Sequence, residues 1–549
     1  MSKVKNIVTG ETITYTIEQQ GCINYKGVKR KDLLIRAAAG GGKSLVLMAR
    51  AKKYIEEAKK SGKKNAVIIF TYNNVLVQVL KEWLELTPED EQYVTVSTLH
   101  KYANKVYGSL PGFKLGNPAY PAVKNNLLKI VLQTTADEIR NEKYLKWGTK
   151  FWAEEFMWMR SMNVFDYSDT EHYFKLERIG RGHEHPMNRI DRIIAFKMFC
   201  AYQDALRKKR VFDDTPQGDE RLLYLSHNKK LIPDKFKYEH ILIDEAQDQS
   251  MTQMMCLKAL IKEDSKGNSI GDVTICMDAN QRIYANRWRP RDVFNVTSKY
   301  LSVPFRCTSQ IDDFAESLKK NNMPVVDEED REEHIIPTAT GEKPKVIHCS
   351  NEIEERRYVL EQIRKWIKDD PNHTIGIMCY TNAAVDKIRK WLSAEHIYCE
   401  DIKNEDDCQY SIMKPGVKLC TMHTAKGLEF MRVILPQFYQ GMIPQNWAIK
   451  DEDALAQQRN VAYVGITRAM HQLLIVYNGR RSQFLDEIDK NLYDEISFEQ
   501  AIEYERKNPT PQYVKREVPV EQRATAKDAL SNNDESDDKP PRKKRCFTI

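Results

Sequence analysis

The 549-residue chain lacks several features that would place it in a restricted class of protein. It has no run approaching the ~18 apolar residues that a membrane-spanning helix needs. Its first ten residues lack the apolar stretch of a secretory signal, so we expect an intracellular location and no stable association with a membrane. Its 11 cysteines include no Cys-x-x-Cys pair, which argues against a structural zinc site and against a disulfide framework.

The composition is that of a soluble chain with room for several folded domains. Hydrophobic residues make up 41% of the sequence and charged residues 30%, which favours a core-forming protein over a disordered one. The 85 Lys and Arg residues against 78 Asp and Glu residues give a net charge of +7, so the chain is mildly basic. This charge permits a nucleic-acid partner but does not by itself indicate one.

Short apolar runs alternate with helical patterns in two parts of the chain. This alternation predicts an α/β fold with parallel sheets, because a parallel strand is reached through a crossover helix. The expected strands of the first part are 33–36, 66–70, 241–243 and 273–277; those of the second part, which begins near residue 301, are 345–348, 374–379, 417–422, 433–436 and 472–477.

Two segments differ from this pattern. Residues 102–205 combine helical periodicity with many aromatic and charged side chains, so we expect a mainly helical insertion. Residues from about 515 onward are polar, which predicts a disordered tail. The basic cluster 542–545 in this tail is compatible with a nuclear address or a weak DNA-binding tail. Cys546 begins a match to a prenylation box, a weaker alternative because isoleucine is not among the usual last residues.

A loop of small residues between an expected strand and an expected helix carries the first chemical signal. Glycines let successive backbone amides face a phosphate, and the N-terminal end of the following helix adds positive potential. Lys43 would bridge the β- and γ-phosphates of a nucleotide, and Ser44 would ligate Mg²⁺. The predicted phosphate-binding loop consists of Ala37, Ala38, Ala39, Gly40, Gly41, Gly42, Lys43 and Ser44.

Two adjacent carboxylates, Asp244 and Glu245, follow the apolar run 241–243. Such a pair is costly at the end of a buried strand unless it serves a cation or is well paired. A helix N-terminus, which favours acidic residues, is the alternative interpretation. Because the chain also has a phosphate-binding loop, we expect Asp244 to be a partner of Mg²⁺ and Glu245 to be the base that orients an attacking water.

The order of these and further motifs resembles that of the UvrD/Rep family of superfamily 1 helicases. The resemblance runs from about residue 16 to residue 484, and segment 304–306 departs from the family's Asn-Tyr-Arg at two of its three positions. The similar segments are 16–19 (the adenine-reading glutamine motif), 244–248 (Walker B), 278–284 (motif III), 304–306 (motif IV), 421–430 (motif V) and 459–469 (motif VI).

The resemblance implies two RecA-like domains with ATP in the cleft between them. Arg306 and Arg468 would then act as arginine fingers on the γ-phosphoryl group. The other implied roles are adenine contact for Gln19, adenine stacking for Phe305, ribose contact for Glu429, γ-phosphate sensing for Gln281, and nucleic-acid contact for Thr71, Tyr72, His100, Tyr284 and His423.

The implied domain order starts with a RecA-like ATPase domain formed by 1–101 and 206–300, interrupted by a helical 1B insertion at 102–205. A second RecA-like domain follows at 301–490, and a C-terminal extension occupies 491–549. Longer family members carry an accessory 2B domain between motifs IV and V. Here the elements of the second RecA-like domain fill most of that interval, so we expect the 2B domain to be absent or reduced to the loop around 401–410.

The resemblance therefore implies an ATP-dependent 3′→5′ DNA helicase or single-stranded DNA translocase that uses Mg²⁺ and acts in repair, replication or defence. Its partners would be single-stranded or 3′-tailed DNA and a protein such as a nuclease or a loader. Two alternatives remain open: an ATP-gated nucleic-acid sensor or adaptor that works with a separate nuclease, and an RNA-directed motor. We expect a cytoplasmic location, at the nucleoid in a bacterium, or a nuclear one in a eukaryote.

Overall fold

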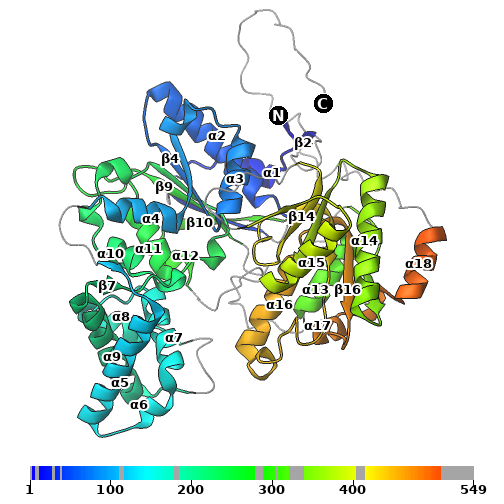
Figure 1. Cartoon of the computed structure of the whole chain (residues 1–549). Coiled ribbons are helices and arrows are strands. Elements are labelled where there is room, and N and C mark those ends of the chain that lie inside the picture. Colours follow the sequence, from blue (N-terminus) through cyan, green and yellow to red (C-terminus); the bar gives the residue numbers. More distant parts are fainter. Residues whose placement is uncertain are drawn as a thin grey trace, which may run out of the picture.

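The computed structural model describes residues 3–5, 12–27, 31–37, 40–110, 116–178, 185–277, 288–302, 307–320, 339–403 and 414–507. These residues form two lobes, each built on a parallel β-sheet, and a helical subdomain attached to the first lobe (Figure 1). The α/β class with parallel sheets predicted from the sequence is confirmed. The predicted tail from about residue 515, including Cys546, lies outside the described residues.

The first lobe contains a six-stranded sheet of order β10-β3-β9-β8-β4-β5, in which every described pairing is parallel. Its central strands are predominantly apolar because both faces of the sheet are covered. The strands are β3 (Asp32–Ala37), β4 (Val67–Thr71), β5 (Val94–Thr98), β8 (His240–Ile243), β9 (Asp272–Met277) and β10 (Val296–Leu301). A separate two-stranded antiparallel sheet joins β1 (Lys3–Lys5) and β2 (Thr12–Thr14).

Helices cover both faces of the first sheet, and alternate strand residues supply the two cores. Leu33 and Ile35 face a core shared with α2, whereas Leu34 faces one shared with α4, α10 and α11. The helices are α1 (Ile17–Ile23), α2 (Lys43–Ser61), α3 (Asn74–Leu84), α4 (Leu99–Gly108), α10 (Glu220–His227), α11 (Met251–Ala259) and α12 (Pro290–Val293). Short 3₁₀ turns used below are η3 (Pro216–Gly218) and η6 (Ala246–Asp248).

The helical subdomain has its own aromatic-rich core, which begins at Ala119, whereas α4 packs in the core of the first lobe. The buried side chain of Arg160 attaches it to the first lobe, because its guanidinium lies 2.7 Å from Asp213 Oδ2 and donates to the carbonyl of Gly218 at 2.8 Å. Its elements are α5 (Pro121–Ile139), α6 (Lys143–Lys146), α7 (Gly148–Ser161), α8 (Thr170–Lys175) and α9 (Arg189–Lys208), with the small pair β6 (Asn117–Pro118) and β7 (Val211–Phe212) at its base.

The second lobe contains a seven-stranded sheet of order β13-β14-β12-β15-β16-β11-β17, again with parallel pairings. The strands are β11 (Lys345–Cys349), β12 (Thr374–Cys379), β13 (Cys399–Asp401), β14 (Gly416–Thr421), β15 (Phe430–Leu435), β16 (Ala469–Asn478) and β17 (Asp494–Ser497). Because β17 pairs with β11, this sheet reaches past residue 490, where the sequence analysis places the domain boundary.

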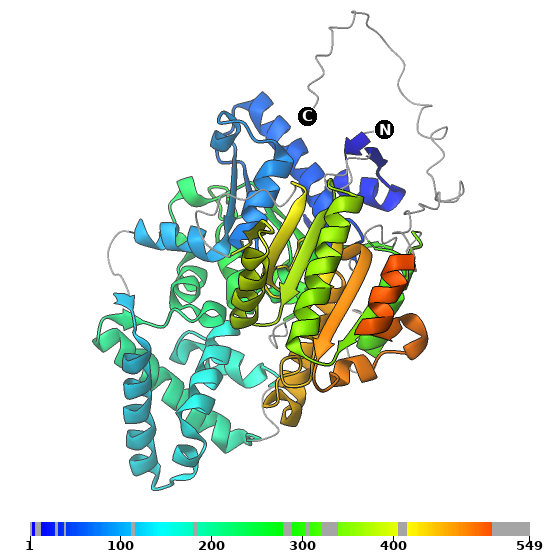
Figure 2. The same cartoon turned by 45° about the vertical axis from the view of Figure 1, so that its right-hand side comes forward.

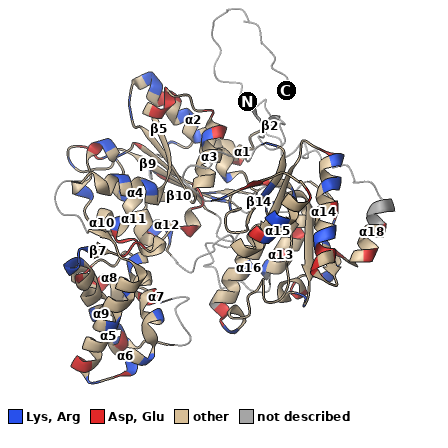
Figure 3. Cartoon of the chain, viewed as in Figure 1, with Lys and Arg blue, Asp and Glu red and all other residues tan. Residues whose placement is uncertain are grey.

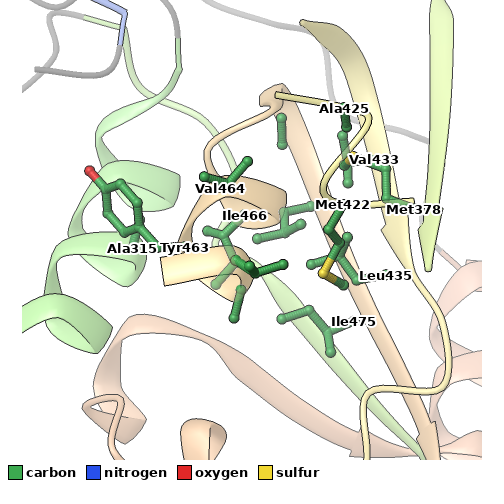
Figure 4. Packing of buried hydrophobic residues seen from close by; sticks show 14 of the residues in the cluster. Ala315, Met378, Met422, Ala425, Val433, Leu435, Tyr463, Val464, Ile466 and Ile475 are labelled. Atoms are coloured by element: carbon green, nitrogen blue, oxygen red, sulfur yellow. The ribbon is translucent and has the colours of Figure 1, made fainter. Parts of the chain in front are cut away.

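Two layers of helices enclose the second sheet. Helices α14 (Glu352–Asp369), α15 (Asn382–Ala394) and α18 (Phe498–Lys507) cover one face, with α14 in front of the strands in Figure 2. Helices α13 (Ser309–Lys320), α16 (Glu452–Ile466) and α17 (Gln483–Asp486) cover the other, and Figure 4 shows residues of α13 and α16 packed against β12, β15 and β16. Exposed helices such as α14 carry both basic and acidic side chains, with Asp and Glu of α14 visible at one end and Lys and Arg over the rest (Figure 3).

The lobes are joined by apolar contacts as well as by the chain. Val75, Leu76 and Val79 of α3 belong to the same buried cluster as Ala425 and Leu428 of the second lobe. The approach is close: a Cβ atom on Gly427 would lie 2.7 Å from the methyl groups of Leu76. Within the described residues, no helix combines the length and apolar character needed to cross a membrane. The nine cysteines described are all free.

Candidate nucleotide-binding site

The predicted phosphate-binding loop joins the carboxyl end of β3 to the N-terminus of α2. Gly40 and Gly42 have φ angles of 82° and 80°, a region that glycine adopts without strain. Lys43 begins α2 and folds back over the loop, where its Nζ donates to the carbonyl oxygen of Ala37 at 2.6 Å. An ammonium group held at the loop and a glycine-lined turn before a helix are the two features that phosphate recognition requires. Ala38 and Ala39 lie outside the described residues.

Gln19 lies against this loop. It is the third residue of α1, where it forms a capping box: the backbone N–H of Thr16 donates to Gln19 Oε1 at 3.0 Å, and the N–H of Gln19 donates to Thr16 Oγ1 at 3.2 Å. The cap fixes the side chain, which is 3% exposed. A Cβ atom on Gly42 would lie 2.6 Å from Gln19 Nε2, so the loop needs glycine here for space as well as for φ.

Ser44 and Asp244 meet across the same site. The hydroxyl of Ser44 donates to Asp244 Oδ2 at 2.7 Å, which joins the start of α2 to the end of β8. Burial, followed by the negative charge of Glu245, raises the pKa of Asp244 from 3.8 to about 6. Oxygen donors of this kind are the ligands that Mg²⁺ prefers, so these two residues fit the cation that usually accompanies a nucleotide.

Replacing Asp244 with asparagine is expected to stabilise the nucleotide-free protein at pH 7.5. Because folding raises the pKa of this carboxyl, the folded state holds the proton more tightly than the unfolded chain does, and ionisation penalises folding. The penalty is complete above about pH 6 and absent below about pH 4, so the variant should gain about 1–3 kcal/mol at pH 7.5 and nothing at pH 4. Denaturant unfolding at both pH values measures this, with Asp137→Asn on the exposed face of α5 as the control. A gain at pH 4 that equals the gain at pH 7.5 would contradict the assignment.

Glu245 occupies a constrained position beside Asp244. Its φ angle of 53° is left-handed, which is uncommon for glutamate and concentrates at functional sites. Gln247 Nε2 donates to Glu245 Oε2 at 2.5 Å. Burial alone would raise the pKa of Glu245, but the positive charges of Lys426, Lys43 and Arg468 outweigh it and hold the pKa below its usual value. The group is therefore ionised at neutral pH, as a base must be.

Arg468 approaches Glu245 from the second lobe. It follows α16, immediately before β16, and is fully buried. Its Nε donates to the carbonyl of Val464 at 3.0 Å, and its two terminal nitrogens donate to the carbonyl of Leu428 at 3.2 Å and to Thr467 Oγ1 at 3.1 Å. These contacts hold the guanidinium rigidly, and its charge lowers the pKa of Glu245 in the first lobe. Glu429, next to Leu428, is half-buried on the same side.

Lys426 is a site residue that the sequence analysis does not identify. It comes from the turn after β14, is fully buried, and forms a close ion pair with Asp248 of η6. Its Nζ also lies 3.8 Å from Glu245 Oε2. The turn 421–428 thus places a second cation of the second lobe against the acidic pair of the first. Its position in motif V, between His423 and Glu429, was the only sequence signal for a functional role. An isolated lysine is usually a solvated charge.

Four of the predicted nucleic-acid contacts lie at, or just after, the carboxyl ends of strands. Thr71 and Tyr72 stand at the carboxyl end of β4, and His100 stands just after the neighbouring strand β5, where its Nε2 lies 2.8 Å from the carbonyl of Pro216. His423 follows β14 in the second lobe, with its ring 5.7 Å from that of Tyr380. The apolar contact between α3 and the turn 421–428 brings the two groups next to one another.

Several predicted residues cannot be placed in this arrangement because they lie outside the described residues: Gln281, Tyr284, Phe305 and Arg306. Trp288, which follows motif III, is buried in the core of the first lobe, and its indole N–H donates to the carbonyl of Gln249 at 2.6 Å. That environment favours a structural role for this tryptophan.

Two parallel-sheet lobes that face one another over a phosphate-binding loop are the architecture of a P-loop nucleotide-binding protein with two RecA-like domains. The sequence model of the UvrD/REP helicase N-terminal domain matches residues 17–304, and that of the UvrD-like helicase C-terminal domain matches residues 399–480. The chain belongs to the UvrD/Rep helicase family.

Individual relatives agree with this assignment. A Mycoplasma capricolum protein named "Probable DNA helicase II homolog" is 22% identical over 493 residues, which cover 83% of this chain and 63% of that protein. DNA helicase II of Escherichia coli is 32% identical over 99 residues, covering 16% of this chain and 14% of that protein. The ATP-dependent DNA helicase PcrA of Leuconostoc citreum is 50% identical over 60 residues, covering 11% and 8%. The matched segments therefore span less than two thirds of each of these relatives.

Proposed function

We propose that this chain is an ATP-dependent motor that moves along single-stranded DNA in the 3′→5′ direction. The observation that carries the proposal is the meeting of Glu245, which stands beside Asp244 and close to Lys43, with Lys426 and Arg468 of the second lobe. Acidic groups from one lobe and cations from the other give a site whose chemistry depends on how the lobes are placed. Such a site can link nucleotide hydrolysis to lobe movement.

In the proposed hydrolysis the loop amides and Lys43 would hold the β- and γ-phosphates. Ser44 and Asp244 would hold Mg²⁺, which would supply positive charge next to the phosphates. Glu245 accepts a proton from the attacking water, which its low pKa permits. Arg468 stabilises the charge that develops on the γ-phosphoryl oxygens, and Gln19 reads the adenine. Arg306, Phe305, Gln281 and Glu429 keep the roles that the family resemblance gives them.

The proposed strand path crosses the loops at the carboxyl ends of β4, β5 and β14. Thr71, Tyr72 and His100 belong to the first lobe and His423 to the second, so opening and closing the cleft changes the spacing between two sets of contacts. Tyr284 is proposed to join them by stacking on a base, as aromatic side chains do in single-strand grooves. Such a motor would work at the nucleoid or in the nucleus, in repair, replication or defence.

The interval in which longer family members carry a 2B domain is occupied here by the second sheet. Residues 345–401 form β11, α14, β12, α15 and β13, and β14 begins at Gly416. The stretches of that interval outside the described residues are 321–338 and 404–413, which are 18 and ten residues long. We therefore propose that the monomer translocates readily but separates duplexes poorly, and that a nuclease, loader or further motor assists it.

Single-stranded DNA is expected to stimulate ATP turnover strongly, whereas strand displacement by the monomer should be weak. The strand contacts are largely ionic, so stimulation should fall with salt along a log–log slope of about −0.7 per phosphate neutralised. ATP turnover and displaced strand are followed together on duplexes with 3′ or 5′ tails, with a matched RNA as a third substrate. Efficient displacement under monomer-loading conditions would contradict the proposal that the monomer separates duplexes poorly. Equal stimulation by RNA would favour an RNA-directed motor.

A further inference from the structure

Arg50 lies in the middle of α2, the helix that follows the phosphate-binding loop, and is 1% exposed. Its guanidinium is surrounded by oxygen atoms. NH1 donates to the carbonyls of Cys22 at 2.6 Å, Tyr25 at 3.1 Å and Ile23 at 3.3 Å. Each of these carbonyls belongs to the last turn of α1 or to the residues just after it.

The last carbonyls of a helix lack the partner that a further turn would supply, and the carbonyls that Arg50 reaches are buried or partly buried. A cation at this end also complements the helix dipole. Arg50 therefore closes the C-terminal end of α1, while the capping box of Thr16 and Gln19 closes the other end. Because α1 has only seven residues, both ends must be held for the helix to keep one position.

The other nitrogens of Arg50 tie the same guanidinium to the sheet. Nε donates to Thr274 Oγ1 of β9 at 3.1 Å, and NH2 donates to the hydroxyl of Tyr54. Tyr54 in turn donates to Asp272 Oδ2 at 3.0 Å. These bonds fix the position of α1 relative to α2 and β9. Helix α2 follows the phosphate-binding loop, and β9 pairs with β3, the strand that leads into the loop.

We infer that Arg50 is a positioning residue for recognition of the nucleotide base: it sets where Gln19 stands relative to the phosphate-binding loop. This inference rests on the proposed nucleotide-binding function. Gln19 lies so close to Gly42 that an added Cβ would come within 2.6 Å of its amide nitrogen, so a small shift of α1 changes what the amide can reach. Arg50 touches the helix and its anchor points, and acts on the base only through Gln19.

The test compares how well the protein distinguishes ATP from GTP, as the ratio of kcat/KM values and of equilibrium binding affinities. Loss of a base-reading amide in Gln19→Ala should lower this ratio by roughly 5- to 150-fold, the range for a good bidentate base contact. Arg50→Lys should lower it by a similar factor, through KM rather than kcat. The double variant should lose no more than Gln19→Ala alone, because both changes remove the same interaction.

Two further measurements separate this role from a general loss of structure. Hydrogen exchange of the amides of 17–25 should quicken in Arg50→Lys while that of β9 stays unchanged. Tyr54→Phe, which removes only the hydroxyl that accepts from Arg50, should lower the ratio in the same direction by about two- to threefold. If Arg50→Lys does not fold, the Tyr54→Phe variant tests the inference in its place. Lys52→Ala, on the exposed side of the same helix, is the control and should keep the wild-type ratio.

A folded Arg50→Lys variant, or a Tyr54→Phe variant, that keeps the wild-type ratio would overturn the inference, as would strictly additive losses in the double variant. A wild-type protein that binds no nucleoside triphosphate, or that binds ATP and GTP equally well, would instead overturn the proposed function. The two failures are therefore distinguishable in the same experiment.

Discussion

Replacing Glu245 with glutamine is expected to lower ATP turnover by about 10²–10⁴-fold, the range typical of a lost general base. ATP affinity should change little, because the carboxylate acts on water whereas Lys43 and the loop amides act on phosphate. The structure sharpens this contrast. The pKa of Glu245 is held low by three cations, so the group is ionised at neutral pH and free of the proton that it must accept, whereas glutamine of the same shape cannot accept a proton.

Lys43→Ala provides the opposite pattern and should weaken ATP binding as well as turnover. Glu239→Gln is the matched control, since Glu239 stands just before β8 at the end of the strand away from the site, where it pairs with Lys63 at 3.0 Å. Turnover and equilibrium binding of ATP are measured for all three variants. Near-normal turnover in Glu245→Gln would show that another group activates the water.

Replacing Arg468 with alanine is expected to lower saturated ATP turnover by about 10³-fold or more, as removal of an arginine finger does, with a much smaller effect on ATP affinity. The guanidinium is fully buried and held by three hydrogen bonds, so its geometry is prepared before the reaction begins. Charge stabilised only in the transition state changes kcat rather than binding.

Arg480→Ala is the control for this variant, because Arg480 is exposed beyond the far end of β16. Rapid-quench measurement of the chemical step separates a slow reaction from slow product release. A large loss of ATP affinity with unchanged turnover at saturation would mean that Arg468 holds the nucleotide rather than the transition state. Since alanine also removes a buried hydrogen-bonding group, Arg468→Lys, which retains a positive charge, should recover only part of the rate.

The central strands could be predicted from the sequence because they are buried on both faces and are therefore continuous apolar runs, as in 67–71. Strands β5 and β10 were not expected, and both lie at the edges of the first sheet. In these edge strands, apolar residues are interspersed with polar ones such as Thr95 and Lys299, and this pattern is also typical of loops.

The same distinction applies to the candidate site. The residues of the phosphate-binding loop are consecutive in the sequence, and so are the two residues of the acidic pair, Asp244 and Glu245. Their residue types could therefore be interpreted directly. The roles of Lys426 and Arg50 depend on partners that are distant in the sequence. The partner of Lys426 is Asp248, and that of Arg50 is the end of α1. A buried cation and a solvated one look alike in a sequence, and only the fold shows which carbonyls or carboxylates surround it.

The attachment of the helical subdomain determines how many parts of this molecule can move independently as rigid bodies. Arg160 is bonded to Asp213 and Gly218, and its own carbonyl accepts from the hydroxyl of Thr252 on α11. Bending at this junction would leave a buried guanidinium without its carboxylate, which costs about 3–5 kcal/mol. The subdomain therefore travels with the first lobe, and a fluorescent label on the exposed face of α5 reports the position of that lobe. For fitting into low-resolution density or for placing distance probes, the chain is best treated as two rigid pieces rather than three.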